Sequence, residues 1–219
     1  MIMLKKLYLI LILCVVTGTV ISQDLSFNLS VITPKNPEPF ELKVSASGSK
    51  IAIEPRNMGT PGSMTIIVDN AKGKQYMLMN ANGQKMAMAL NIDAANKAIT
   101  KEPKVTVTKE VKTIDGYKCT RVICETDEQK SDLWITQDVG MQYAEFYKMF
   151  NSSKGPQASM VKIPELKTVK GFPIEIVSTD TKKGETVTMK IKNISKAKID
   201  AKIFSLEGYQ VMEAPGSKP

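Results

Sequence analysis

The chain has 219 residues and a formal net charge of +8, with 30 lysines and arginines against 22 aspartates and glutamates. The absence of histidine excludes Ser-His and Cys-His catalysis and histidine-ligated zinc. Only Arg56 and Arg121 are arginines and the lysines are scattered, so the composition does not predict a nucleic-acid-binding protein. We expect a non-enzymatic protein without a cofactor, whose basic surface can contact anionic lipids.

Residues 1–22 have the pattern of a cleaved secretory signal peptide. Lys5 and Lys6 precede an apolar run over residues 7–16, and Val20 and Ser22 suit the positions before a cleavage site. The run is too short for a transmembrane helix. The sequence therefore predicts a periplasmic or secreted protein that begins near residue 23.

Cys14 raises the alternative of a lipoprotein signal, in which a cysteine is acylated. Such cysteines normally follow a small residue, whereas Leu13 precedes Cys14 and the apolar run continues after it. We therefore expect a soluble mature protein without a lipid anchor at Cys14.

Short strands dominate the rest of the chain. Hydrophobic and polar residues alternate around residues 40–45, 64–68, 104–112 and 187–191, and turn-forming stretches separate these segments. This pattern is typical of an antiparallel sheet with one face in solvent. We predict a single α+β domain over residues 23–212, followed by a disordered tail over 213–219. Its strongly curved antiparallel sheet, a half-open barrel, would carry one or two helices on its concave face.

Four methionines lie in a predicted hairpin over residues 75–90, QYMLMNANGQKMAMAL: Met77, Met79, Met86 and Met88. A two-residue type I′ turn at Asn82-Gly83 would pair Met79 with Met86 and Met77 with Met88. A four-residue loop would instead pair Met77 with Met86. Either register places all four thioethers on one face.

The opposite face of this hairpin is also apolar, which predicts a central position in the sheet. The methionines have three interpretations. They fill the core, they line a cavity for a flexible apolar ligand, or they bind copper(I) through their thioethers.

A helix is predicted over residues 139–152, capped by Asp138 and ended by Gly155-Pro156. It carries aromatic residues at i, i+3, i+4 and i+7, namely Tyr143, Phe146, Tyr147 and Phe150. A weaker helix is predicted over residues 93–98.

Cys119 and Cys124 are expected to be free, buried thiols. Five residues along a strand span about 17 Å and place the two side chains on opposite faces. A disulfide needs Cα atoms about 4.4–6.8 Å apart.

Four stretches carry a resemblance to a known family: IDGYKC over residues 114–119, DLWIT over 132–136, GFPI over 171–174 and FSLEGYQVM over 204–212. They resemble an uncharacterised family of exported bacterial domains with a "GYKC … W-T" signature and an "F-x-x-P-x-G-Y" ending, although Leu206-Glu207 lacks the proline. That family in turn resembles the LolA/LolB-like lipoprotein carriers. The resemblance implies a half-open antiparallel barrel that is plugged by helices and receives acyl chains.

We therefore expect a protein that binds a lipid, a lipoprotein, an acyl chain or an apolar polymer. The candidate ligand-binding residues are Met77, Met79, Met86, Met88, Trp134, Phe146 and Phe150; no catalytic or metal-ligating residues are predicted. One alternative is a structural or protein-interaction module of the cell envelope with a self-filled core. The other is a copper(I)-binding protein that uses the methionine pairs.

Overall fold

The computed structural model describes residues 24–56, 63–92, 103–151 and 163–214. Four predictions fall outside these residues. They are the signal peptide over residues 1–22, Cys14 without a lipid anchor, the weak helix over residues 93–98 and the helix stop at Gly155-Pro156. The strands are β1 (Leu25–Thr33), β2 (Asn36–Ser47), β3 (Lys50–Arg56), β4 (Ser63–Asp69), β5 (Lys74–Ala81), β6 (Gln84–Asn91), β7 (Lys104–Ile114), β8 (Tyr117–Glu125), β9 (Gln129–Thr136), β10 (Phe172–Asp180), β11 (Thr186–Ser195) and β12 (Gln210–Glu213). The helices are α1 (Tyr143–Asn151) and the 3₁₀-helix η1 (Ala201–Phe204).

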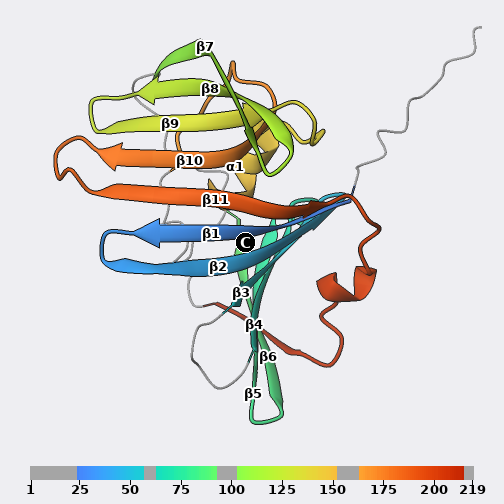
Figure 1. Ribbon diagram of the computed structural model, residues 1–219. Coiled ribbons are helices and arrows are strands. Elements are labelled where there is room, and N and C mark those ends of the chain that lie inside the picture. The colour runs from blue at the N-terminus through green and yellow to red at the C-terminus, as the bar shows by residue number, and fades with distance from the viewer. Residues whose placement is uncertain (1–23, 57–62, 93–102, 152–162, 215–219) are drawn as a thin grey trace, which may run out of the picture.

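All twelve strands form one sheet in the order β12-β6-β5-β4-β3-β2-β1-β11-β10-β9-β8-β7 (Figure 1). Neighbouring strands are antiparallel except β12, which runs parallel to β6. The predicted antiparallel sheet is confirmed, but the protein is mostly β and the predicted strongly curved, half-open barrel is wrong. The sheet is not closed, because β7 and β12 remain separate edges, and it is not strongly curled. Alternating residues specify the faces of a sheet, whereas twist and bulges set its curvature.

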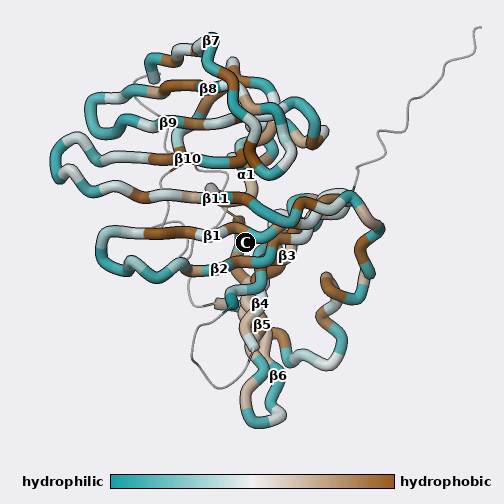
Figure 2. Tube along the Cα trace, in the orientation of Figure 1, coloured by the Kyte–Doolittle hydropathy of each residue, from teal (hydrophilic) through white to brown (hydrophobic). Residues whose placement is uncertain are grey.

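Alternating burial explains why these segments form strands. In β1, Leu25, Phe27, Leu29 and Val31 are buried, and the residues between them are partly exposed. The same alternation continues across the neighbouring strands, so one face of the sheet carries the main hydrophobic core. Hydrophobic residues concentrate in the strand bodies and hydrophilic ones at the hairpin tips (Figure 2).

Helix α1 packs on this core face through its predicted aromatic stripe. Tyr143 and Phe146 are fully buried and Phe150 is nearly so. The helix is shorter than predicted, and Asp138 does not cap it. Instead, the carboxylate of Glu145 accepts a hydrogen bond (2.9 Å) from the backbone N–H of Gln142, so the helix closes its own first turn.

The C-terminal segment covers the second face of the sheet near β5 and β6. Leu206 and Tyr209 pack against the buried Ile67, Leu78 and Ala87. The apolar second face of the hairpin is thus explained, but its predicted central position is wrong. The hairpin lies next to β12 at one end of the sheet. Glu213, expected to begin the tail, ends β12 and its carboxylate lies 2.7 Å from the ammonium of Lys74.

The two cysteines of the described chain are free and fully buried, as predicted. No helix within the described ranges is long and apolar enough to cross a membrane.

Candidate functional site

The β5–β6 hairpin has the tighter of the two predicted turns. Ala81 pairs with Gln84, which leaves Asn82 and Gly83 as a two-residue loop. Both loop residues have positive φ, 53° and 79°, as a type I′ turn requires. Met79 therefore faces Met86 and Met77 faces Met88, and all four thioethers lie on one side of the hairpin.

The register across the sheet extends this group into two rows on the core face. The first row contains Met212, Met88, Met77 and Ile66 from β12, β6, β5 and β4. The second contains Gln210, Met86, Met79 and Met64 from β12, β6, β5 and β4. We call the six methionines of these rows the methionine face. Side chains directly opposite on adjacent strands have Cβ atoms about 4.5–5.5 Å apart, so neighbours within a row can contact one another.

Exposure increases along the first row toward the edge of the sheet. Ile66 is fully buried, Met77 and Met88 are half-buried, and Met212 is 42% exposed. Met64 and Met77 also pack against the main core. The methionine face is therefore the place where the core continues outward to solvent at the β12 end.

A buried polar side chain, Gln75, also lies on this face. Gln75 lies two residues before Met77 on β5, so it points to the same side, and its row partners are Val68 and Leu90. Gln75 is only 2% exposed, and among the described residues its buried Nε2 has no hydrogen-bond partner. A buried donor left unpaired costs about 1–3 kcal/mol.

The aromatic residues of α1 form a separate layer over the middle of the sheet. The Phe146 ring lies 5.5 Å from Phe172 of β10 and 6.5 Å from Phe27 of β1, between ring centroids. Phe150 stacks behind it at 5.0 Å. The Tyr143 hydroxyl donates a hydrogen bond to the Pro164 carbonyl oxygen at 2.8 Å. The layer is therefore packed, and its buried hydroxyl has a hydrogen-bond partner.

The sequence profile of a family described as "Domain of unknown function (DUF4412)" matches residues 27–208. The chain belongs to this family. A comparison with curated proteins finds no significant match.

Solved structures resemble the DUF4412 domain at low sequence identity. An uncharacterized conserved protein from Thermus thermophilus is 10% identical over 88% of this chain and 91% of its own, with a TM-score of 0.51. PNGF-II is 12% identical over 89% of this chain with a TM-score of 0.48, but the match covers only 31% of PNGF-II. The domain therefore spans about a third of that protein. A putative outer membrane lipoprotein-sorting protein domain from Vibrio parahaemolyticus is 6% identical over 83% of this chain and 89% of its own, with a TM-score of 0.26.

Trp134 lies apart from the other predicted site residues of the DUF4412 domain. Its strand, β9, is seven positions from β5 in the sheet. It alternates with the buried Leu133 and Ile135, and the Lys112 ammonium lies 4.1 Å from its ring centroid. Trp134 therefore belongs to a polar surface on β7–β10 and does not join the methionine face.

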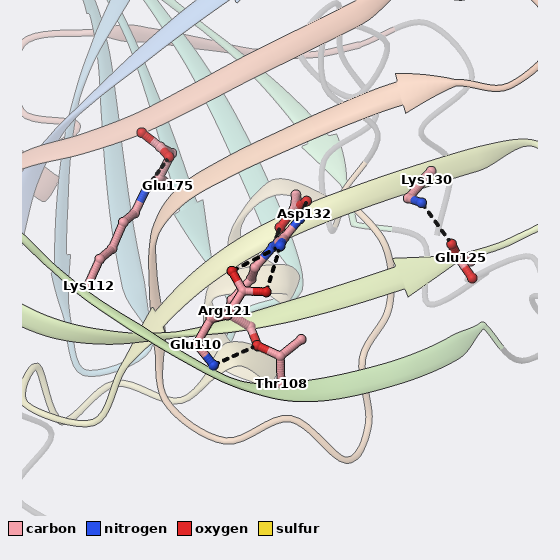
Figure 3. Close-up of polar contacts among 8 residues, drawn as sticks. All are labelled: Thr108, Glu110, Lys112, Arg121, Glu125, Lys130, Asp132 and Glu175. Atoms are coloured by element: carbon pink, nitrogen blue, oxygen red, sulfur yellow. Dashed lines mark hydrogen bonds and ion pairs between the residues drawn. The ribbon is translucent and has the colours of Figure 1, made fainter.

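Arg121 organises that polar surface. Its guanidinium donates two 2.6 Å hydrogen bonds to the Asp132 carboxylate and further bonds of 2.9 and 3.0 Å to Glu110 (Figure 3). These hydrogen bonds hold the pKa of Asp132 below its usual value of 3.8. The Lys112 ammonium forms an ion pair with the Glu175 carboxylate at 3.0 Å. Because the charges neutralise one another, this surface is best explained as a stabilising network.

The described part of the DUF4412 domain contains no group of three or more His, Cys, Asp or Glu side chains that could hold a metal ion. Burial raises the pKa of Cys124 to about 11 and also raises that of Cys119, so both thiols stay protonated at neutral pH. Protonated thiols are poor nucleophiles and poor metal ligands. The methionine face and Gln75 are therefore the strongest candidates for a binding site.

Proposed function

We propose that this DUF4412 protein is an exported, non-enzymatic binding protein that holds an acyl chain of a lipid or lipoprotein against its methionine face. The proposal rests on one observation: side-chain exposure increases toward the β12 edge of the sheet, from Ile66 through Met77 and Met88 to Met212. An acyl chain lying against the methionine face would extend the hydrophobic core and remove apolar surface from water.

Methionine suits this role better than the branched residues that fill the rest of the core. Its unbranched thioether side chain adapts to irregular and mobile partners. Burying an acyl chain contributes about 0.8 kcal/mol per methylene, so contact with several methionines would give useful affinity. Such a surface would recognise length and flexibility more than chemical detail.

Other features support the same ligand class. The sequence resembles the LolA/LolB-like carriers, which receive acyl chains, and it begins with the pattern of a secretory signal. The net positive charge favours contact with anionic membrane surfaces, from which a lipid would be collected. The absence of histidine and the protonated thiols argue against catalysis.

Native mass spectrometry of the protein purified from an exporting host, without organic extraction, tests the proposal. We expect a lipid-sized adduct that is reduced in Met77→Gln and Met88→Gln, because a polar amide disfavours apolar contact. Val107→Gln is the matched control, since Val107 is 64% exposed on the opposite edge strand β7. Adducts that persist equally in all three variants, or no adduct in any sample, would contradict it.

One observation also favours a copper(I) site as a second candidate. The parallel pairing of β12 with β6 adds Met212 beside Met88, so three thioethers lie in one row. Soft thioether ligands select copper(I). Stoichiometric copper(I) in competition with a chromogenic chelator would support this function, and its loss in Met88→Leu at unchanged stability would assign the site.

A further inference from the structure

Building on the proposed function, we propose that Gln75 donates a hydrogen bond from Nε2 to the neutral ester or amide carbonyl of the bound acyl chain. Gln75 would therefore make the site specific for acyl esters and amides over plain hydrocarbons. The inference rests on the burial of the side chain, on its missing partner and on its place in the sheet.

The missing partner is unusual for a side chain in this position. Most buried polar side-chain atoms in folded proteins have at least one hydrogen-bond partner. Only 2% of the Gln75 surface is exposed, yet its Nε2 has no hydrogen-bond partner within the described part of the chain. A ligand carbonyl would supply the acceptor that the protein does not provide, and the donor would then be satisfied only in the complex.

The place of Gln75 fits this role. It lies on the core face at the end of β5 away from the hairpin turn, next to the fully buried Val68. Met77 and Met79 follow on the same side of β5, at roughly 7 and 13 Å along the strand. A carbonyl held at Gln75 would direct the attached chain along these two methionines toward the hairpin turn.

The ligand carbonyl should be neutral. One neutral amide donor does not compensate for moving an ionised carboxylate out of water. An ester or amide has a strong acceptor without that penalty, so acylated lipids and lipoproteins fit better than free fatty acids.

Displacement of the fluorophore N-phenyl-1-naphthylamine from the mature protein tests the inference. The competitors are methyl decanoate, tridecane and ionised decanoate, all delivered from cyclodextrin. The variant Gln75→Leu removes the donor and keeps most of the volume. Asn36→Leu is the matched control, because Asn36 is an exposed amide at the β1–β2 turn, and β3 and β4 separate β2 from β5 in the sheet. Gln75→Met repeats the test if the leucine variant does not fold.

We expect the wild type and Asn36→Leu to bind methyl decanoate about three- to tenfold more tightly than tridecane, with decanoate weakest. Gln75→Leu should lose this preference, keep its affinity for tridecane and unfold at the same or a higher temperature. An unchanged preference in Gln75→Leu would overturn the inference and leave the proposed function standing. If Gln75→Leu keeps the preference for methyl decanoate and unfolds at a lower temperature, the inference is overturned and Gln75 has a structural role. Failure of the wild type to bind any competitor would overturn both.

Discussion

Met77 and Met88 lie opposite each other across the β5–β6 hairpin, on the face of the sheet that also carries the fully buried Ile66. The pair is half-buried, so it is neither complete core nor ordinary surface. This intermediate position has measurable consequences for stability, because the free energy lost on truncating a side chain depends on the contacts it makes.

Truncation should cost less at Met88 than at Ile66. We expect Ile66→Ala to lower the free energy of unfolding by ~3–4 kcal/mol and Met88→Ala by ~1–2 kcal/mol, because fewer contacts are lost at the half-buried site. Met88→Leu keeps the volume and should cost below about 1.5 kcal/mol. Urea unfolding of the three variants measures these values. Equal losses for Met88→Ala and Ile66→Ala would show that Met88 is ordinary packed core.

Two glycines with positive φ should differ in their tolerance of alanine. At Gly83 in the hairpin turn no atom lies within 4 Å of an added Cβ, so Gly83→Ala should cost only the left-handed backbone penalty of ~1–2 kcal/mol. At Gly171 the added Cβ would collide with the Thr136 carbonyl oxygen and the Gln137 side chain. We therefore expect Gly171→Ala to cost at least ~3 kcal/mol by the same measurement. The reverse order would contradict the described backbone.

The pair of Arg121 and Asp132 should make stability depend on acid pH. Its hydrogen bonds lower the folded-state pKa of Asp132 below 3.8. A depressed carboxyl pKa gives stability that is present above the unfolded-state pKa and lost as the pH falls through the folded-state pKa. Asp132→Asn should therefore destabilise the protein by ~1 kcal/mol near pH 7 and by progressively less at acid pH, as the pH falls below 3.8 through the folded-state pKa.

Glu125→Gln provides the comparison for this prediction. Glu125 pairs with Lys130 at 3.1 Å, but both side chains are more than 40% exposed. Its removal should change stability little at either pH, because exposed ion pairs contribute little. An equal pH dependence in both variants would argue against a special role for the Arg121 network.

The two described thiols should be unreactive until the protein unfolds. Burial raises the pKa of Cys124 to about 11 and shields Cys119, so little thiolate forms at neutral pH. We expect a thiol reagent to modify both cysteines at once in denaturant without reductant, and neither in the native protein over the same time. Rapid modification of one thiol in the native state would show that β8 opens locally.

Local periodicity predicted several elements well. The two-residue period of the methionine hairpin predicted that all four methionines share one face, and the Asn82-Gly83 turn gave the observed register as one of two alternatives. The aromatic spacing in α1 likewise predicted the buried face of that helix. In β1, the alternation of Leu25, Phe27, Leu29 and Val31 carried an equally clear signal that the strand prediction did not use.

Features that depend on distant parts of the chain could not be predicted in this way. The hairpin was expected in the middle of the sheet because both of its faces are apolar, but Leu206 and Tyr209 return from the C-terminus to cover one face. The same return places Met212 beside Met88. Gln75 shares the alternation of Met77 and Met79, but only the packed structure shows that its Nε2 is buried without a hydrogen-bond partner among the described residues.

Photolabelling tests the central claim most directly. A methyl ester of a diazirine-bearing fatty acid would be bound to the mature protein, irradiated and mapped by peptide mass spectrometry, with excess methyl decanoate as competitor. The account predicts saturable, competed labelling in peptides that contain residues 74–91 and 210–213, which carry the methionine face on β5, β6 and β12. Labelling that is confined to β7–β9, or that methyl decanoate does not reduce, would contradict it.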